Sequence, residues 1–434
     1  MEKLFQLKKH NTNVRTEVIG GLTTFFAMAY IIFVNPNFLS QTGMDHTAVM
    51  LATCISAAIG CFLTAFMANV PFAQAPGMGL NAFFTYTICF GMGYTWQQGL
   101  AIVFISGLIF LAISISPIRK QIIDSIPAPL KAAISAGIGL FICLIGLLNA
   151  GIVTAGNNLL DLSNITSGAP LLALIGLIIT GILMAWKVKG ALFIGILVTT
   201  VIGIPMGVTN LSNVNISFEG ISVAPTFFKL SFVGLLANGI LPLLTAIVTF
   251  AMCDCFDTVG TLIGTAGSAG MLDENGNLPR GDKALIADAV ATCTGALMGT
   301  STVTTFVESS TGISEGARTG LSSVVVGILF LLGCVLAPIA GIIPSAATAP
   351  ALIIVGMFMI GNVAKIDWSD VEVALPCFLT IAMMPFAYSI SDGIGFGFIS
   401  YTLIKVARGK FKDVPVLLYI LSALFVVMYI LAAL

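Results

Sequence analysis

The chain has 434 residues, of which 58% are hydrophobic and only 9% are charged, and its formal net charge is −1. A water-soluble domain carries about 25% charged residues, so lipid is the expected solvent of this chain. The near-zero net charge gives no reason to expect a nucleic-acid partner. The apolar stretches are long and continuous, which favours membrane-spanning helices over a closed barrel.

The N-terminus and the cysteines exclude several other classes of protein. Residues 1–17 mix both signs of charge and lack the apolar centre and cleavage site of a signal peptide. The nine cysteines are scattered, mostly inside apolar runs, and no C-x-x-C pair occurs. We therefore expect no metal site, no redox motif and no cofactor, and we expect the cysteines to pack as small apolar side chains.

Apolar segments follow one another along the whole chain. A first set is expected at residues 19–40, 47–69, 75–93, 97–116, 130–150, 169–186 and 189–208. A second set is expected at residues 234–264, 284–300, 302–317, 319–342, 346–362, 371–389 and 392–408. The chain is accordingly divided into an N-terminal segment (1–18), a first repeat (19–208), a loop (209–233), a second repeat (234–408) and a hydrophobic tail helix (409–434). The tail either adds a span or lies against the rest of the protein.

Basic residues gather in alternate loops between these segments. They are Arg119, Lys120, Lys131, Lys187, Lys189, Arg280, Lys283, Lys365, Lys405, Arg408, Lys410 and Lys412. With a cytoplasmic N-terminus, all of these loops are cytoplasmic under the positive-inside rule. Two sets of seven segments then begin on opposite sides of the membrane, as in an inverted repeat. The sequence predicts an all-α, multi-pass protein of the inner membrane with about 14 spanning helices in two inverted repeats of seven.

The third and tenth segments interrupt the helical pattern at matching places. The third contains Pro71, Pro76 and several glycines before Asn81, and the tenth opens with a Thr- and Val-rich run over residues 300–305. Proline and glycine interrupt helices, and β-branched runs favour extended chain. Two interrupted segments at equivalent positions of two repeats indicate a binding site at the membrane midplane, although two apolar loops would give the same pattern.

Acidic residues inside apolar segments are the second indication of a site, because each costs at least ~2.5 kcal/mol at a helix centre. Asp254 and Asp257 share one helix face, Asp288 lies in the ninth segment and Glu308 in the tenth. No basic residue lies in the segments that carry Asp254, Asp257 and Glu308, so we interpret these three as functional. They would take up and release a proton, or accept the N–H groups of a nucleobase. Asp288 is equally consistent with a relay and a structural role.

Other readings of the polar residues remain possible at this point. Glu315 and Arg318 are expected to pair near the cytoplasmic end of their segment. The G-x-S-x-G sequence at residues 312–316 would suit a serine hydrolase, but the two histidines, His10 and His46, lie outside or at the edge of the membrane. An intramembrane aspartyl protease, a passive channel and a carrier of uracil, xanthine or a small anion are the remaining alternatives.

Several motifs of this sequence resemble one transporter family. They are Gln74-Ala-Pro-Gly-Met-Gly-Leu-Asn81, Phe256-Asp257-Thr-Val-Gly-Thr-Leu, Val307-Glu308-Ser-Ser-Thr-Gly, the opening stretch at residues 20–30 and the stretch at residues 383–390. Together they resemble the AzgA-like branch of the nucleobase–cation symporter-2 family, which contains adenine, guanine and hypoxanthine permeases. The resemblance covers nearly the whole chain. It implies 14 helices divided into core and gate domains, with short antiparallel strands where the third and tenth helices begin.

The resemblance also implies a function and a set of site residues. The function is purine uptake coupled to protons, and the lipid bilayer, a purine base and a proton are the implied partners. Pairing of two copies through their gate domains is a further analogy. The base would be bound by Asp254, Glu308, Asn81 and Ser309. Stacking of Phe306 or Phe83 on the base is a separate hypothesis. Proton coupling or organisation of the site would fall to Asp257, Asp288 and Thr258.

Overall fold

The computed structural model describes residues 2–116, 126–156, 159–211, 221–268, 270–273, 278–337 and 342–432. Arg119, Lys120 and part of the predicted loop at 209–233 lie outside these residues. In the described part of the chain, seven helices are long and apolar enough to cross a membrane, and four shorter apolar helices accompany them. The prediction of a helical, multi-pass membrane protein is confirmed.

The helices and strands follow the predicted segments in order. The first half contains α1 (Glu2–Phe5), α2 (Val14–Met28), α3 (Ile31–Leu39), η1 (Ser40–Thr42), α4 (His46–Leu63), η2 (Thr64–Ala68), β1 (Gln74–Pro76), α5 (Met78–Ala82), η3 (Phe83–Gly91), α6 (Trp96–Ile115), α8 (Ala128–Asn149), β2 (Val153–Gly156), β3 (Leu159–Leu162), α9 (Gly168–Ala185) and α10 (Ala191–Gly203).

The second half repeats this order of elements. It contains α11 (Ile240–Ser268), α12 (Gly281–Met298), β4 (Val303–Thr305), α13 (Ser309–Ser314), α14 (Gly320–Gly333), η4 (Cys334–Leu336), α16 (Ser345–Ile360), η5 (Gly361–Lys365), α17 (Val371–Phe386), α18 (Ile390–Ala407), η6 (Phe411–Asp413) and α19 (Val416–Ala432). The hairpin of β2 and β3 was not predicted, since its residues were assigned to a loop.

Polar side chains fix where several of the helices begin. Asp45 accepts a hydrogen bond from the backbone N–H of Ala48 at 2.7 Å at the start of α4. Thr95 and Gln98 form a reciprocal capping box at the start of α6. These bonds satisfy backbone N–H groups that have no partner within the helix, which matters most where no water is available to replace them.

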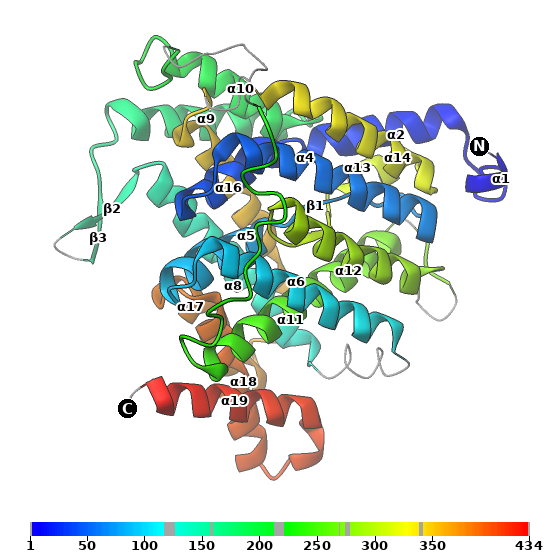
Figure 1. Ribbon diagram of the computed structural model, residues 1–434. Helices are drawn as coiled ribbons and strands as arrows, with labels where there is room; N and C mark the ends of the chain where they lie inside the picture. The colour runs from blue at the N-terminus through cyan, green and yellow to red at the C-terminus, as the bar shows by residue number, and fades with distance from the viewer. Residues whose placement is uncertain are drawn as a thin grey trace.

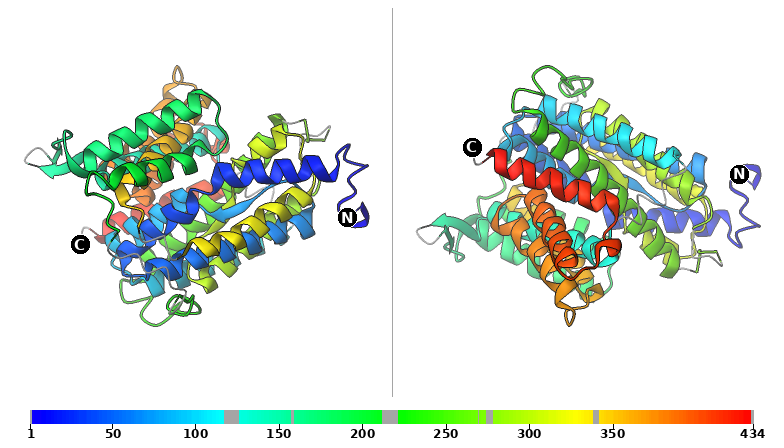
Figure 2. Two further views of the ribbon diagram at one scale, coloured as in Figure 1. Left: turned by 90° about the horizontal axis from the view of Figure 1, so that it is seen from above. Right: turned by 90° about the horizontal axis from the view of Figure 1, so that it is seen from below.

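The helices assemble into two groups that pack against each other (Figures 1 and 2). In the core group, α12 packs on α4 and α6, and α14 packs on α2 and α4. In the gate group, α8 packs on α16 and α17, and α9 packs on α10 and α16. Each group takes helices from both halves of the chain, so neither half folds as a separate domain. This is the expected division of two interlocked repeats into core and gate.

The two interrupted segments meet as a pair of short strands inside the core group. β1 pairs with β4 in antiparallel register, with Gln74 opposite Thr305 and Pro76 opposite Val303. Both strands are fully buried, and a short helix follows each one, α5 after β1 and α13 after β4. The predicted strands at the start of the third and tenth segments are confirmed. The loop alternative for these segments was wrong.

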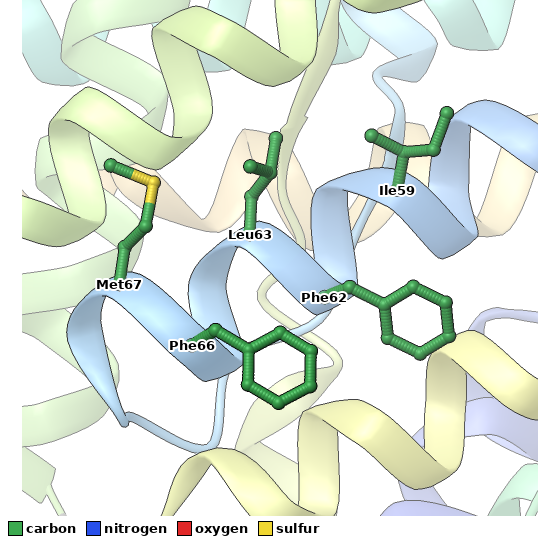
Figure 3. A pocket seen from close by; sticks show the side chains of 5 residues that line it. All are labelled: Ile59, Phe62, Leu63, Phe66 and Met67. Carbon is green, nitrogen blue, oxygen red and sulfur yellow. The ribbon is translucent and has the colours of Figure 1, made fainter.

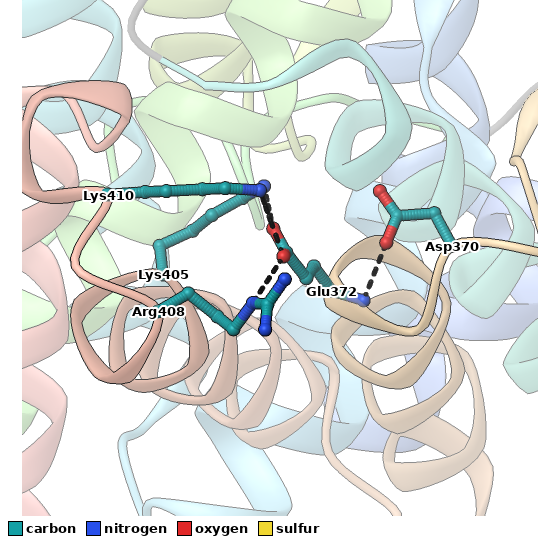
Figure 4. A network of polar contacts seen from close by, with 5 residues as sticks. All are labelled: Asp370, Glu372, Lys405, Arg408 and Lys410. Atoms are coloured by element: carbon teal, nitrogen blue, oxygen red, sulfur yellow. Dashed lines mark hydrogen bonds and ion pairs between the residues drawn. The ribbon is translucent and has the colours of Figure 1, made fainter.

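A cluster of charges ties the gate helices together at one end. The Glu372 carboxylate at the start of α17 accepts hydrogen bonds from Lys405 at 2.8 Å, Arg408 at 2.9 Å and Lys410 at 2.7 Å (Figure 4). Asp370 caps the same helix through the backbone N–H of Glu372. One acid therefore holds three cations from α18 and the turn that follows it.

The tail helix α19 packs against α18 and α11 (Figure 2). Ser422 and Thr402 share a hydrogen bond of 2.8 Å, and the Tyr429 hydroxyl donates to the carbonyl of Asp392 at 3.4 Å. Later residues of α19 thus meet earlier residues of α18, so the two helices run antiparallel. The tail is an integral part of the helical packing rather than a separate extension.

The outer face of the core group carries a shallow apolar groove. It lies along α4 and η2 and is lined by Ile59, Phe62, Leu63, Phe66 and Met67 (Figure 3). No polar side chain contributes to this lining. A surface of this kind suits contact with lipid chains rather than recognition of a polar solute.

Candidate functional site

Asp288 of α12 is the centre of a buried hydrogen-bond network at the crossing of β1 and β4. Its side chain is fully buried. One carboxylate oxygen accepts from Gln74 at 3.0 Å and from Thr305 at 2.8 Å, and the other accepts from Thr258 at 2.9 Å. The carboxylate therefore joins both strands to α11. The structural alternative for Asp288 accounts for these bonds, since its oxygens are engaged in holding the strands.

Thr258 extends this network to β4. Its hydroxyl donates to Asp288, so the hydrogen bond of 2.9 Å between Thr258 and Thr304 has Thr304 as its donor. Close packing supports the same crossing, because a Cβ atom added at Gly77 would lie 2.5 Å from the Thr304 methyl group. A larger residue at position 77 would separate the strands. Thr258 therefore contacts both Asp288 on α12 and Thr304 on β4.

Asp254, one turn before Thr258 on α11, has a different environment. Thr292 donates to one of its oxygens at 2.8 Å, while the other oxygen, Oδ1, is buried and has no hydrogen-bond partner. Buried polar atoms are almost always paired, and an unpaired one costs about 1–3 kcal/mol. Oδ1 of Asp254 is therefore an acceptor available to a ligand.

Asn81 on α5 shows the same property on the facing side. Its side chain is fully buried, and neither the amide oxygen nor the amide nitrogen has a partner. Phe83 and Phe250 lie edge to face with ring centroids 4.7 Å apart, which brings the end of α5 beside α11 one turn before Asp254. A donor and two acceptors thus lie on neighbouring elements at the β1–β4 crossing.

Glu308 stands directly before α13 and is half-buried. The hydroxyl of Tyr30 donates to its Oε1 atom at 2.6 Å. The hydroxyl of Ser309, which is also predicted to bind the ligand, accepts a hydrogen bond of 3.0 Å from the backbone N–H of Ala73. Phe306 and Phe83 are both buried, at 6% and 1% exposure, and Phe83 already packs on Phe250.

One face of α11 opens from the site toward the end of that helix. Three exposed residues follow one another at helical spacing on this face, namely Asp257, Gly260 and Gly264. A Cβ atom added at either glycine would have no other atom within 4 Å. Val307, beside Glu308, is 56% exposed. We call this open face the vestibule. It runs toward the end of α11, and Arg280, which follows that helix, lies near His10 of the N-terminal segment. Asp257 and Glu308 are thus less enclosed than Asp254 and Asp288, which are both buried.

The predicted pairing of Glu315 with Arg318 was wrong. Glu315 is bonded to Lys189, which lies in the turn before α10, at 2.6 Å. Arg318 donates from its guanidinium to the carbonyls of Ile313 and Ala317, which end α13. The two residues follow one another around the end of α13, and the backbone carbonyls released there are closer partners for the guanidinium.

Sequence reasoning found the acids and Asn81 but missed Tyr30, which was treated as part of one continuous apolar segment. The segment still forms one span over Val14–Thr42, but its regular helix is interrupted between α2 and α3, where Ala29 and Tyr30 keep helical dihedral angles. We call this interruption the α2–α3 break. A signal existed, since Tyr30 carries the only hydroxyl between Thr24 and Asn35. No three His, Cys, Asp or Glu side chains in the described ranges come together as a candidate metal site. The unpaired side-chain atoms of Asn81 and Asp254 are available for hydrogen bonds to a polar ligand.

Comparison with known proteins places these features in a wider group. A model described as "Permease family" matches residues 15–396. The chain is 46% identical to a putative permease of Methanocaldococcus jannaschii, over 99% of this chain and 98% of the relative. It is 45% identical to the guanine/hypoxanthine permease of Bacillus subtilis, over 99% of both chains. It is 42% identical to an adenine permease of Escherichia coli, over 98% of this chain and 95% of the relative.

Among solved structures, the transmembrane domain of a cyanobacterial bicarbonate transporter has the same fold. The TM-score is 0.68, with 18% sequence identity, and the match covers 87% of this chain and 97% of that one. At this identity the likeness concerns the fold alone. It confirms the predicted architecture of two inverted repeats of seven helices.

Proposed function

Because the chain belongs to the permease family, we propose that it is a secondary active transporter that imports purine nucleobases together with protons. Adenine and guanine/hypoxanthine permeases are 42% and 45% identical to it over nearly the whole chain. The observation that carries the proposal is the set of unpaired polar atoms at the β1–β4 crossing. Asn81 supplies a donor and an acceptor, and Asp254 supplies an acceptor. A purine edge presents N–H donors and ring-nitrogen acceptors, which match this set.

The four acids are proposed to have three different roles. Asp254 and Glu308 are proposed to bind the base, and Asp257, which lies in the vestibule beside Glu308, is proposed to serve proton coupling. Asp288 is proposed to organise the site, because its oxygens hold Gln74, Thr305 and Thr258. Phe306 remains the proposed stacking residue, on the edge of the site.

Transport would follow from movement of the core group against the gate group. A proton settles on one of the accessible acids, the base binds at the strand crossing, and the core group then shifts so that both leave on the other side. We place the N-terminus in the cytoplasm of a cell bounded by an inner membrane, because the basic loops gather on the same side as Lys8 and Arg15. Pairing of two copies through the gate group is part of the same proposal.

A carrier of a small anion is the main alternative with this fold. Anion sites favour basic side chains or free helix N-termini, whereas Asp254, Asp257 and Glu308 would repel an anion. A carrier of uracil or xanthine would differ from the proposed purine carrier only in the shape of the binding pocket.

Uptake of radiolabelled adenine, guanine, hypoxanthine and uracil into cells that lack their own permeases tests the proposal. Purine uptake that collapses with a protonophore would support it. Glu308→Gln is expected to abolish uptake while the protein remains in the membrane at normal abundance. Absence of purine uptake in cells shown to contain the protein, or normal uptake by the Gln variant, would contradict the proposal.

A further inference from the structure

Tyr30 connects a break in the first membrane segment to the acid of the tenth. The residue lies between α2 and α3 and is 1% exposed. Its hydroxyl donates to Oε1 of Glu308 at 2.6 Å, across a sequence separation of 278 residues. A length of 2.5–2.7 Å is typical of an O–H group bonded to a carboxylate, which is about twice as strong as a bond between neutral groups.

The surroundings of Tyr30 make this hydroxyl unusual. Met28, Ala29, Ile31 and Ile32 are each fully buried and have no group that could replace it as a donor. A phenylalanine would fill the same space without the cost of burying a hydroxyl. The Tyr30 hydroxyl is therefore expected to have a role other than packing. Its partner is Glu308, one of the acids of the candidate site.

The bond leaves only one oxygen of Glu308 free to change its partner. While the Tyr30 hydroxyl donates, as it does in this structure, Oε1 is the acceptor of the bond. A proton on Glu308 is consequently confined to Oε2. The titratable groups that face Glu308 are Tyr30 from the α2–α3 break and Asp257 from α11.

We propose that Tyr30 is a positioning residue of the transport site, which fixes Glu308 so that its Oε2 atom alone exchanges between the transported proton and an N–H group of the base. This role rests on the proposed function. It assigns Tyr30 to the same site as Asn81 and Asp254 and makes the break between α2 and α3 part of the binding machinery.

The test compares Tyr30→Phe with Tyr94→Phe in the purified full-length protein. Tyr94 is a matched control, because it is also buried and its hydroxyl donates to the carbonyl of Leu235 at 3.3 Å, remote from Glu308. Equilibrium binding of radiolabelled adenine, guanine and hypoxanthine is measured first. Tyr30→Phe is expected to weaken binding on the order of ten- to a hundred-fold, the usual effect of losing a hydrogen bond to a charged group. Tyr94→Phe is expected to change it less than about threefold.

Uptake kinetics and thermal unfolding then separate positioning from folding. Tyr30→Phe should raise the half-saturating base concentration by about the same factor as the binding constant and lower the unfolding temperature no more than Tyr94→Phe does. Unchanged binding by Tyr30→Phe, or equal weakening by both variants, would overturn the role of Tyr30 alone. Wild-type protein that binds none of the three bases would overturn the proposed function and this role together.

Discussion

The Lys189 ammonium group lies 2.6 Å from the Glu315 carboxylate. This ion pair joins the gate group to the end of α13 in the core group. Lys189 precedes Gly190, and a Cβ atom at that glycine would lie 3.0 Å from the backbone oxygen of Phe26 on α2. The turn before α10 therefore rests directly on the core. A movement of the core group past the gate group would have to break or stretch this ion pair.

Reversing both charges should reveal how much the Lys189–Glu315 pair contributes to transport. Both side chains are partly exposed, so the pair is expected to stabilise the fold by about 1 kcal/mol or less. Lys189→Glu should change the uptake rate by several-fold and leave binding of the base unaltered. The double variant Lys189→Glu with Glu315→Lys should restore the wild-type rate. Independent, additive effects of the two changes would show that the pair is not coupled to the movement.

Glu17 should be one of the residues on which stability depends most. Its buried carboxylate accepts hydrogen bonds from the backbone N–H groups of Arg318, Thr319 and Ser322, at 2.8, 3.2 and 3.2 Å, and so caps α14 from a distant helix. Glu17→Ala leaves these N–H groups unpaired and is expected to lower the free energy of unfolding by at least about 2 kcal/mol. Thermal unfolding in detergent measures the loss.

A suitable control for Glu17 is the exposed cap of α2. The Asn13 side chain accepts a hydrogen bond of 3.0 Å from the backbone N–H of Thr16. Asn13→Ala should lower the free energy of unfolding by only about 1 kcal/mol, because water can replace the lost acceptor. Equal unfolding temperatures for the Glu17 and Asn13 variants would contradict the importance of the buried cap.

Asp288→Asn should disturb the strand crossing although it changes the shape of the side chain very little. The amide NH₂ group would face at least one of the hydroxyl or amide donors that now point at the carboxylate. We expect weaker binding of the base by tenfold or more, together with a lower unfolding temperature. Thr305→Ser should behave as wild type, because it keeps the hydroxyl, whereas Thr305→Val should reproduce part of the defect. Wild-type binding by Asp288→Asn would remove this residue from the site.

The vestibule predicts a pattern of chemical labelling. In a variant whose native cysteines are replaced, Gly264→Cys should react with a membrane-impermeant maleimide from the side of the membrane that carries the N-terminus. Ala266→Cys is the control, since Ala266 lies two residues away and is fully buried. Labelling of both positions at one rate, or of Gly264→Cys from the opposite side only, would contradict an opening on this face.

The sequence predicted the two interrupted segments and the acids inside the helical packing, because the signals for both are local. The third segment contains prolines and glycines, which interrupt a helix, and the tenth contains a β-branched run. Acids inside apolar runs have an unfavourable free energy of membrane insertion, so each one indicates a special role. Partners could not be predicted in the same way. Glu315 has a neighbour of opposite charge three residues away, yet it binds Lys189, and Glu17 appeared as an ordinary residue of the N-terminal segment. Such pairings depend on how helices distant in sequence approach each other.

Tyr30 illustrates the same limit at the site itself. Neither Gly nor Pro marks the turn between α2 and α3, so the break was invisible to helix-breaking rules. The partner of Tyr30 lies 278 residues further on, where Glu308 accepts its hydroxyl, and no local pattern could point to it.

The pairing of β1 with β4 has a consequence for how the protein is made. Gln74 and Thr305 are 231 residues apart, and a strand pair this short has little stability without its surroundings. During synthesis, β1 has no pairing partner in the membrane until the second repeat, which contains β4, has been inserted. Domains that emerge early on the ribosome can usually fold at once, but here the first repeat cannot. The transport site is therefore one of the last features of the protein to form during biogenesis, and a chain truncated before β4 would lack it altogether.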